Sequence, residues 1–136
     1  MPVSPDPSAI EEMPLPGQGL AVAAESLYLI NLLLLPGLAF LALLWLYQRH
    51  RATAPPLARQ HLRQTLSASL WAGVLLIIAN LLILILGGYD KASIWVMVIL
   101  YFTTVHATLV MLGILGLARA LAGQPYAYPL VGKLLP

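Results

Sequence analysis

The chain has 136 residues, of which 60% are hydrophobic and only 9% carry a charge. Soluble domains are about 45–50% apolar and about 25% charged, so this composition excludes an ordinary soluble domain. The sequence has no cysteine, which excludes disulfides, thiolate metal sites and cysteine nucleophiles. No charged residue falls within 26–48, 64–89 or 92–118. Because about 20 uncharged apolar residues span the bilayer core as a helix, the sequence predicts an all-α integral membrane protein with three transmembrane helices.

The N-terminal segment, residues 1–24, is rich in proline and carries three acidic residues but no basic one. A secretory signal peptide begins with a basic segment, so we do not expect one here. We interpret the segment as a flexible acidic tail, either a solubilising end or a docking segment for a partner. The predicted organisation is therefore this tail, a transmembrane domain over 25–122 and an interfacial C-terminal tail over 123–136.

The first predicted span covers residues 26–48 and is interrupted by Pro36 and Gly37. Proline removes a backbone donor and clashes with the carbonyl four residues earlier, so we expect a kink. The freed carbonyl needs a partner within the membrane. We expect Asn80 of the second span to satisfy this kink or to bond Asn31, because all three groups lie at a similar predicted depth.

The second and third predicted spans cover residues 65–88 and 92–120. The turn between them contains Gly87 and Gly88, which favours an antiparallel helical hairpin. The segment 57–64 can also be helical after two prolines, so a short surface helix before the second span is an open alternative.

Six of the seven Lys and Arg residues lie in the loop after the first span or beyond the third, and only Lys91 lies on the opposite side. The positive-inside rule therefore predicts an N-out/C-in, multi-pass protein of a bacterial inner (cytoplasmic) membrane. The loop residues either serve topology alone or bind anionic lipid headgroups or an acidic partner. Membrane lipids are expected partners, whereas nucleic acid is not, because the net charge is only +2. The candidate lipid or partner contacts are Arg49, Arg51, Arg59, His61 and Arg63.

Small and polar side chains recur at helical spacing within the spans. Such stripes favour close helix packing, so we expect other membrane subunits or a homo-oligomer as partners. The candidate polar and packing residues are Asn31, Pro36, Ser69, Gly73, Asn80, Thr103, His106 and Gly113.

His106 is the ionisable residue near the centre of the third span. It could be an axial haem ligand, a proton relay, or a neutral imidazole hydrogen-bonded across the bundle. No other predicted span contains a histidine to act as the second haem ligand, so the structural role is favoured and no cofactor is predicted.

The sequence contains no glycine-rich phosphate loop and no histidines at metal-binding spacing, and Glu25 and Asp90 are assigned to span boundaries. We therefore predict a non-enzymatic inner-membrane protein that acts as a structural, assembly or accessory subunit of a membrane complex. The alternative is an oligomeric channel or transporter component with a polar pathway near His106 and Asn80.

A distinctive motif follows the third span, in which Gly123, Tyr126, Tyr128 and Pro129 are spaced Gly-x-x-Tyr-x-Tyr-Pro. It resembles the closing motif of a family of small bacterial membrane proteins of unknown function. That family is grouped with the chloroplast inner-envelope import component Tic-twenty, and it also resembles certain magnetosome-membrane proteins. The residues 61–65 before the second span resemble the same family. In physical terms, the glycine can end a helix, the tyrosines can anchor at headgroup level, and the proline blocks helix continuation.

Overall fold

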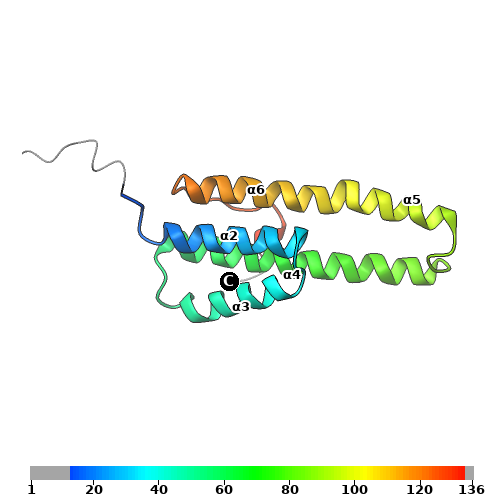
Figure 1. The fold of residues 1–136 in the computed structure, drawn as a ribbon, viewed down its shortest axis with the longest axis horizontal. Coiled ribbons are helices and arrows are strands. Elements are labelled where there is room, and N and C mark those ends of the chain that lie inside the picture. Colours follow the sequence, from blue (N-terminus) through cyan, green and yellow to red (C-terminus); the bar gives the residue numbers. More distant parts are fainter. Residues whose placement is uncertain (1–12, 134–136) are drawn as a thin grey trace, which may run out of the picture.

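The computed structural model describes residues 13–133, and all regular elements within that range are helices. The last long helix, residues 92–121, is continuous and contains a π-helical turn over Phe102–His106 (Figure 1). The prediction of an all-α fold is confirmed. In chain order the elements are α2 (Gln18–Leu33), α3 (Leu38–His50), α4 (Pro56–Ile85), α5 (Ala92–Tyr101), η1 (Phe102–His106), α6 (Ala107–Leu121) and the 3-10 turn η2 (Val131–Lys133).

The region predicted as the first span folds as two helices, α2 and α3, and α3 runs back in the opposite direction (Figure 1). The break lies at Pro36 and Gly37, where Gly37 has a φ of 88°. Glycine reaches this left-handed region without a side-chain clash, so the chain reverses instead of kinking. At 1.5 Å per residue, α2 and α3 are about 24 and 20 Å long, too short for a hydrocarbon core of about 30 Å.

The prediction of three spans is therefore wrong. Two helices of the described chain, Pro56–Ile85 and Ala92–Leu121, are long and apolar enough to cross a membrane, with 30 residues each. They contain most of the predicted second span, 65–88, and all of the predicted third span, 92–120. The segment 57–64 forms the first turns of α4 and not a separate surface helix.

The start of α2 lies beside the end of α6. The Gln18 side-chain amide donates a hydrogen bond of 2.7 Å to the Leu121 carbonyl. The start of α2 and the end of α6 therefore both lie at the end of the bundle where α4 begins (Figure 1). The N-out/C-in prediction is wrong for this fold, because it requires those two ends on opposite sides. The flexible-tail prediction is also wrong for residues 18–24, which belong to α2, while residues 1–12 lie outside the described part of the chain.

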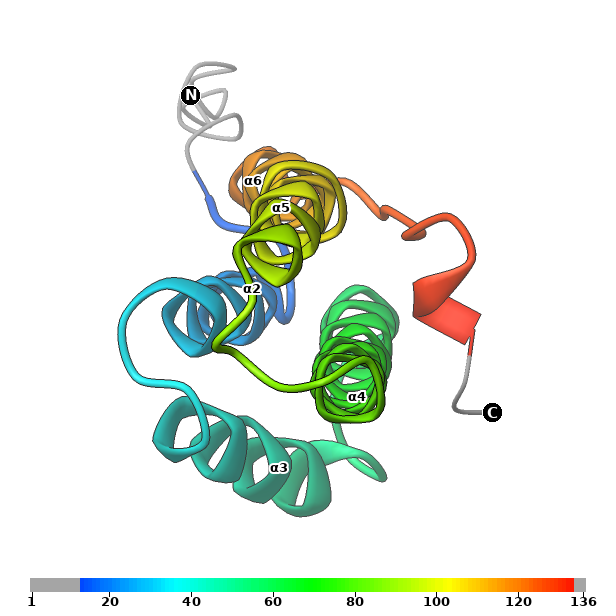
Figure 2. The same ribbon diagram turned by 90° about the vertical axis from the view of Figure 1, so that its right-hand side faces the viewer.

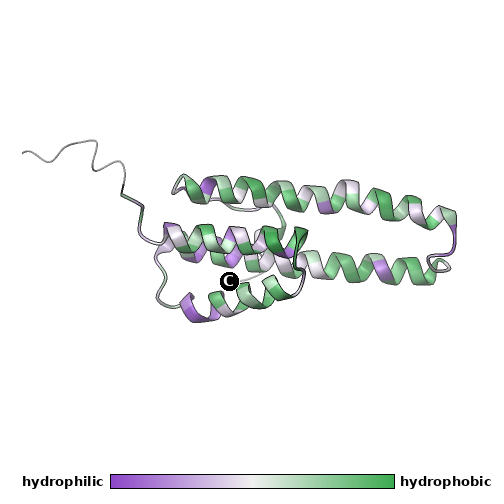
Figure 3. Ribbon diagram, viewed as in Figure 1, coloured by the Kyte–Doolittle hydropathy of each residue, from purple (hydrophilic) through white to green (hydrophobic). Residues whose placement is uncertain are grey.

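At one end of the molecule, which we call the packed end, α2 is the central helix and packs against α3, α4 and α6 (Figure 2). Ala21 and Ala24 are fully buried on α2, and such small side chains let helices approach closely. Beyond the Pro36–Gly37 turn, α4 and α5 continue as an antiparallel pair that we call the far hairpin (residues 74–101) (Figure 1). The far hairpin is predominantly hydrophobic, whereas hydrophilic residues gather toward the packed end (Figure 3).

Candidate functional site

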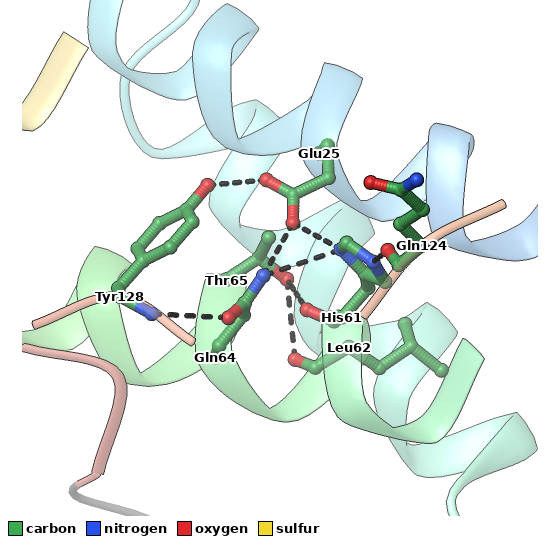
Figure 4. A network of polar contacts seen from close by, with 7 residues as sticks. All are labelled: Glu25, His61, Leu62, Gln64, Thr65, Gln124 and Tyr128. Carbon is green, nitrogen blue, oxygen red and sulfur yellow. Dashed lines mark hydrogen bonds and ion pairs between the residues drawn. The ribbon is translucent and has the colours of Figure 1, made fainter. Parts of the chain in front are cut away.

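Glu25 is the carboxylate at the centre of a buried polar network at the packed end (Figure 4). Its Oε1 atom lies 2.5 Å from His61 Nδ1 and accepts a hydrogen bond of 2.7 Å from the Gln64 amide. Its Oε2 atom accepts a hydrogen bond from the Tyr128 hydroxyl. One acidic side chain of α2 therefore joins α4 to the C-terminal segment.

His61 is fully buried and uses both ring nitrogens in this network. Its Nε2 atom lies 3.0 Å from the Gln124 carbonyl oxygen, and a carbonyl only accepts, so Nε2 carries a hydrogen. One further proton is shared in the contact with Glu25. Whether it is on the imidazole or the carboxyl group, the pair has no net charge, which allows its burial. The prediction that His61 contacts lipid or a partner is wrong, because its side chain is enclosed by the protein.

Gln64 and Thr65 fix the geometry of the network from α4. The Tyr128 backbone N–H donates to Gln64 Oε1 at 3.2 Å, and this contact directs the Gln64 amide nitrogen toward Glu25. The Thr65 hydroxyl donates to the His61 carbonyl at 2.7 Å. These residues share one helical face with His61, since they follow it by three and four positions.

Tyr128 is fully buried beside Tyr28, with 5.5 Å between their ring centroids. The prediction that Tyr128 anchors at headgroup level is therefore wrong. Burial and the adjacent Glu25 carboxylate raise the pKa of the Tyr128 phenol, so it stays a hydrogen-bond donor. Gly116 of α6 makes room for this contact, because a Cβ atom there would overlap the Glu25 carboxylate and lie 2.6 Å from the Tyr128 hydroxyl. Gly123 has a φ of 65° and lets the chain turn back after α6.

Asn31 lies at the break between α2 and α3, where its Oδ1 atom accepts a 3.0 Å hydrogen bond from the Gly37 N–H. Asn80 instead donates to the Leu76 carbonyl at 2.9 Å and accepts from the Tyr89 hydroxyl. The prediction that Asn80 satisfies the break or bonds Asn31 is wrong, because Asn80 lies in the far hairpin, beyond the reach of α2.

A cavity of about 570 Å³ lies between the α2–α3 turn, the middle of α4 and η1. Its walls include His106 and Ser69. The Ser69 side chain is 4% exposed, and its hydroxyl has no hydrogen-bond partner among residues 13–133. Asn80 lines a neighbouring cavity of about 350 Å³, so the structure places His106 and Asn80 in different cavities.

Of the other predicted packing residues, Gly113 is buried against Tyr28 and Leu29, where an added Cβ atom would overlap both side chains. Gly73 has open space at the position of a Cβ atom, and Thr103 is exposed. The predicted packing residue Gly73 therefore does not pack against another helix of the described chain, and Ile77, one turn further along α4, is 61% exposed.

The predicted basic contacts lie at the packed end. Arg49 and Arg51 are exposed at the end of α3, with the Arg49 guanidinium 5.4 Å from the centre of the Trp45 ring. Arg59 and Arg63 lie on the first turns of α4 and line a cleft beside the C-terminal segment. Tyr126 stacks edge-on against Tyr128, and Pro129, which follows Tyr128, is exposed.

Sequence reasoning missed Glu25, which it assigned to a span boundary. A signal was present, because Ala21, Ala24, Glu25 and Tyr28 recur at spacings of three and four, typical of one buried helix face that begins before the uncharged run. No group of three His, Cys, Asp or Glu residues that could hold a metal ion is found within residues 13–133.

A family model, described as the magnetosome magnetite crystal formation protein family, matches residues 18–135. The matched range starts at the first residue of α2 and includes every member of the Glu25 network. Comparison with curated proteins and with solved structures gives no match. The resemblance to magnetosome-membrane proteins is supported, whereas the grouping with Tic-twenty stays a prediction. The chain belongs to the magnetosome magnetite crystal formation protein family.

Proposed function

We propose that the chain is a non-enzymatic accessory protein that assists magnetite crystal formation in the magnetosome membrane through contacts with other membrane proteins. Family membership supports the location and the process. We keep the predicted multi-pass insertion, now with α4 and the α5–α6 helix crossing the bilayer and the α2–α3 hairpin entering it from one side. A bacterial inner membrane, or a membrane derived from it, is the compartment that this proposal requires.

The far hairpin is the observation that carries the proposal. Most of its large apolar side chains are exposed, including Ile77 at 61%, Ile85 at 78% and Ile99 at 62%. Exposed apolar surfaces of this extent are covered in a membrane protein by lipid or by neighbouring helices. The surface therefore suits lateral association with other subunits or with further copies of the chain.

The buried pair formed by Glu25 and His61 supports a role without catalysis. Both carboxylate oxygens and both imidazole nitrogens already bond to groups of the same chain, and both side chains are fully buried. A general acid or base must reach a substrate proton directly or through one water molecule. We therefore assign this pair to holding helices together.

Photo-crosslinking tests the proposed contacts. A photoreactive amino acid at position 77 or 99, both exposed in the far hairpin, is expected to give adducts with membrane proteins or a second copy in native membranes. The matched control is position 66, where Leu66 is 3% exposed and should give no intermolecular adduct. Adducts with lipid alone at both exposed positions would contradict the proposal.

Complementation tests the proposed process. In a magnetite-forming bacterium whose own family member has been deleted, expression of the chain is expected to restore crystal size, as seen by electron microscopy. Wild-type amounts of the chain in the membrane together with unrestored crystals would contradict the assignment.

The alternative, an oligomeric channel or transporter component, is favoured by the 570 Å³ cavity that His106 and Ser69 line at the middle of α4. The lining is mostly apolar, but an ionisable side chain such as His106 within a membrane-spanning bundle is typical of an ion or proton pathway. Ion flux into proteoliposomes that disappears in the His106→Leu variant would support transport. Absence of flux with the wild-type chain would contradict it.

A further inference from the structure

The cleft that Arg59 and Arg63 line lies beside the Glu25 network, between the first turns of α4 and the C-terminal segment. Its volume is about 500 Å³, and Arg59, Arg63 and Lys133 contribute three positive charges to its walls. Among residues 13–133, none of those that line the cleft is acidic. Gln60 adds an amide group from α4, whereas the Gln64 amide nitrogen is directed at Glu25. The cleft therefore has the charge and the donors of an anion site.

The guanidinium groups indicate which anion fits. Arg59 and Arg63 are separated by one helical turn and so project from the same side of α4. A guanidinium group forms paired hydrogen bonds with phosphate oxygens, and a lysine ammonium adds a point charge. The cleft volume exceeds what a lone phosphate ion needs and leaves room for a headgroup attached to it.

The position of the cleft along α4 indicates the source of that phosphate. Arg63 is the last charged residue before the uncharged stretch 64–89, so the cleft lies where the apolar part of α4 begins. In a membrane this level is the headgroup region, where basic residues meet anionic lipids. A phospholipid phosphate is therefore present at the height of the cleft whenever the protein is inserted.

We propose that this cleft binds the phosphate of an anionic phospholipid headgroup. Gln64 and Tyr128 line the cleft and also belong to the Glu25 network, so the two sites share a wall. A headgroup held between Arg59 on α4 and Lys133 on η2 bridges the helix and the C-terminal segment. Binding therefore stabilises the packing of the C-terminal segment against α4.

Thermal unfolding of the detergent-purified full chain tests the proposal with added phosphatidylglycerol, phosphatidylcholine or inorganic phosphate. Phosphatidylglycerol is expected to raise the Tm by about 5 °C, whereas phosphatidylcholine and phosphate leave it nearly unchanged. Native mass spectrometry should show one tightly bound phosphatidylglycerol per chain.

The variants separate the cleft from general charge attraction. Arg59→Gln combined with Lys133→Gln is expected to abolish both the Tm shift and the bound lipid. The matched control, Arg49→Gln combined with Arg51→Gln, removes the same charge from exposed residues of the same end and should keep both. Lys133→Gln alone leaves intact the hydrogen bond from Arg59 to the Ala54 carbonyl, and it should reduce the shift at least by half.

Three results would overturn the proposal. The first is a wild-type Tm that phosphatidylglycerol does not raise. The second is equal loss of the shift in the two double variants, which would indicate attraction by net charge. The third is a shift of the same size with inorganic phosphate alone, which would assign the cleft to a free anion.

Discussion

The packed end and the far hairpin use polar side chains in opposite ways. At the packed end, Glu25 bonds to His61 and Tyr128, which lie 36 and 103 residues away in the sequence. In the far hairpin, Asn80 donates to the carbonyl four residues earlier in its own helix, and Thr104 in the adjoining π turn does the same. At the packed end, polar bonds between distant residues thus hold the helices together. In the far hairpin the position of the helices depends on the lipid or the neighbouring helices that cover its apolar surface.

The largest expected effect is that of Glu25→Leu, which breaks the network at its centre. Loss of the carboxylate leaves His61, Gln64 and Tyr128 with unpaired buried groups. We expect a loss of about 3–5 kcal/mol in the free energy of unfolding, measured by denaturant titration in detergent. A loss below about 1 kcal/mol would show that the network does not hold the packed end together.

Two glycine substitutions compare tight and open sites directly. Gly116→Ala forces a Cβ atom against the Glu25 carboxylate and the Tyr128 hydroxyl, and should cost about 1–3 kcal/mol. Gly73→Ala meets open space and should be neutral or stabilise by up to about 1 kcal/mol through helix propensity. Equal effects on the Tm would contradict the difference between these sites.

A pair of asparagine substitutions compares the helix break with the far hairpin. Asn31→Leu removes the acceptor for the Gly37 N–H, and we expect a loss of about 1 kcal/mol in unfolding free energy. Asn80→Leu removes only bonds within the far hairpin and should change stability by less than about 0.5 kcal/mol. A larger loss for Asn80→Leu than for Asn31→Leu would indicate that Asn80, and not Asn31, stabilises the break between α2 and α3.

The smallest expected effect concerns the pH dependence of stability. Because the pKa of Tyr128 is raised in the folded protein, its contribution to stability is full below the ordinary tyrosine pKa of about 10 and is lost as pH rises above it. Absorbance titration of phenolate should show one late-ionising tyrosine fewer in Tyr128→Phe than in the wild-type chain. A titration identical in both proteins would contradict the buried position.

The two later helices could be predicted from the sequence because charge-free stretches of this length have few alternatives in a membrane protein. The reversal at Pro36 and Gly37 could not, since a proline break permits either a kink or a turn. Which of these forms depends on the packing of α2 between α4 and α6, and residue spacing alone does not contain that information.

The candidate site was predicted in part. The family resemblance identified residues 61–65 and Tyr128 as distinctive, but it did not indicate that they contact each other. Glu25 joins them, and its position before an uncharged run favoured a boundary assignment. A stripe that includes Ala21 and Tyr28 was the local signal. The contact between Glu25 and Tyr128, however, joins residues 103 positions apart and depends on how α2 packs against α4 and α6.

The chain reversal between α2 and α3 is tested most directly by finding on which side of the membrane each end of the chain lies. The chain has no cysteine, so single cysteines at the exposed positions Met13, Asp90 and Ala122 can be labelled with a membrane-impermeant thiol reagent. The structure predicts that positions 13 and 122 are labelled from one side and position 90 from the other. Labelling of positions 13 and 90 from the same side, with 122 opposite, would contradict it and restore three spans.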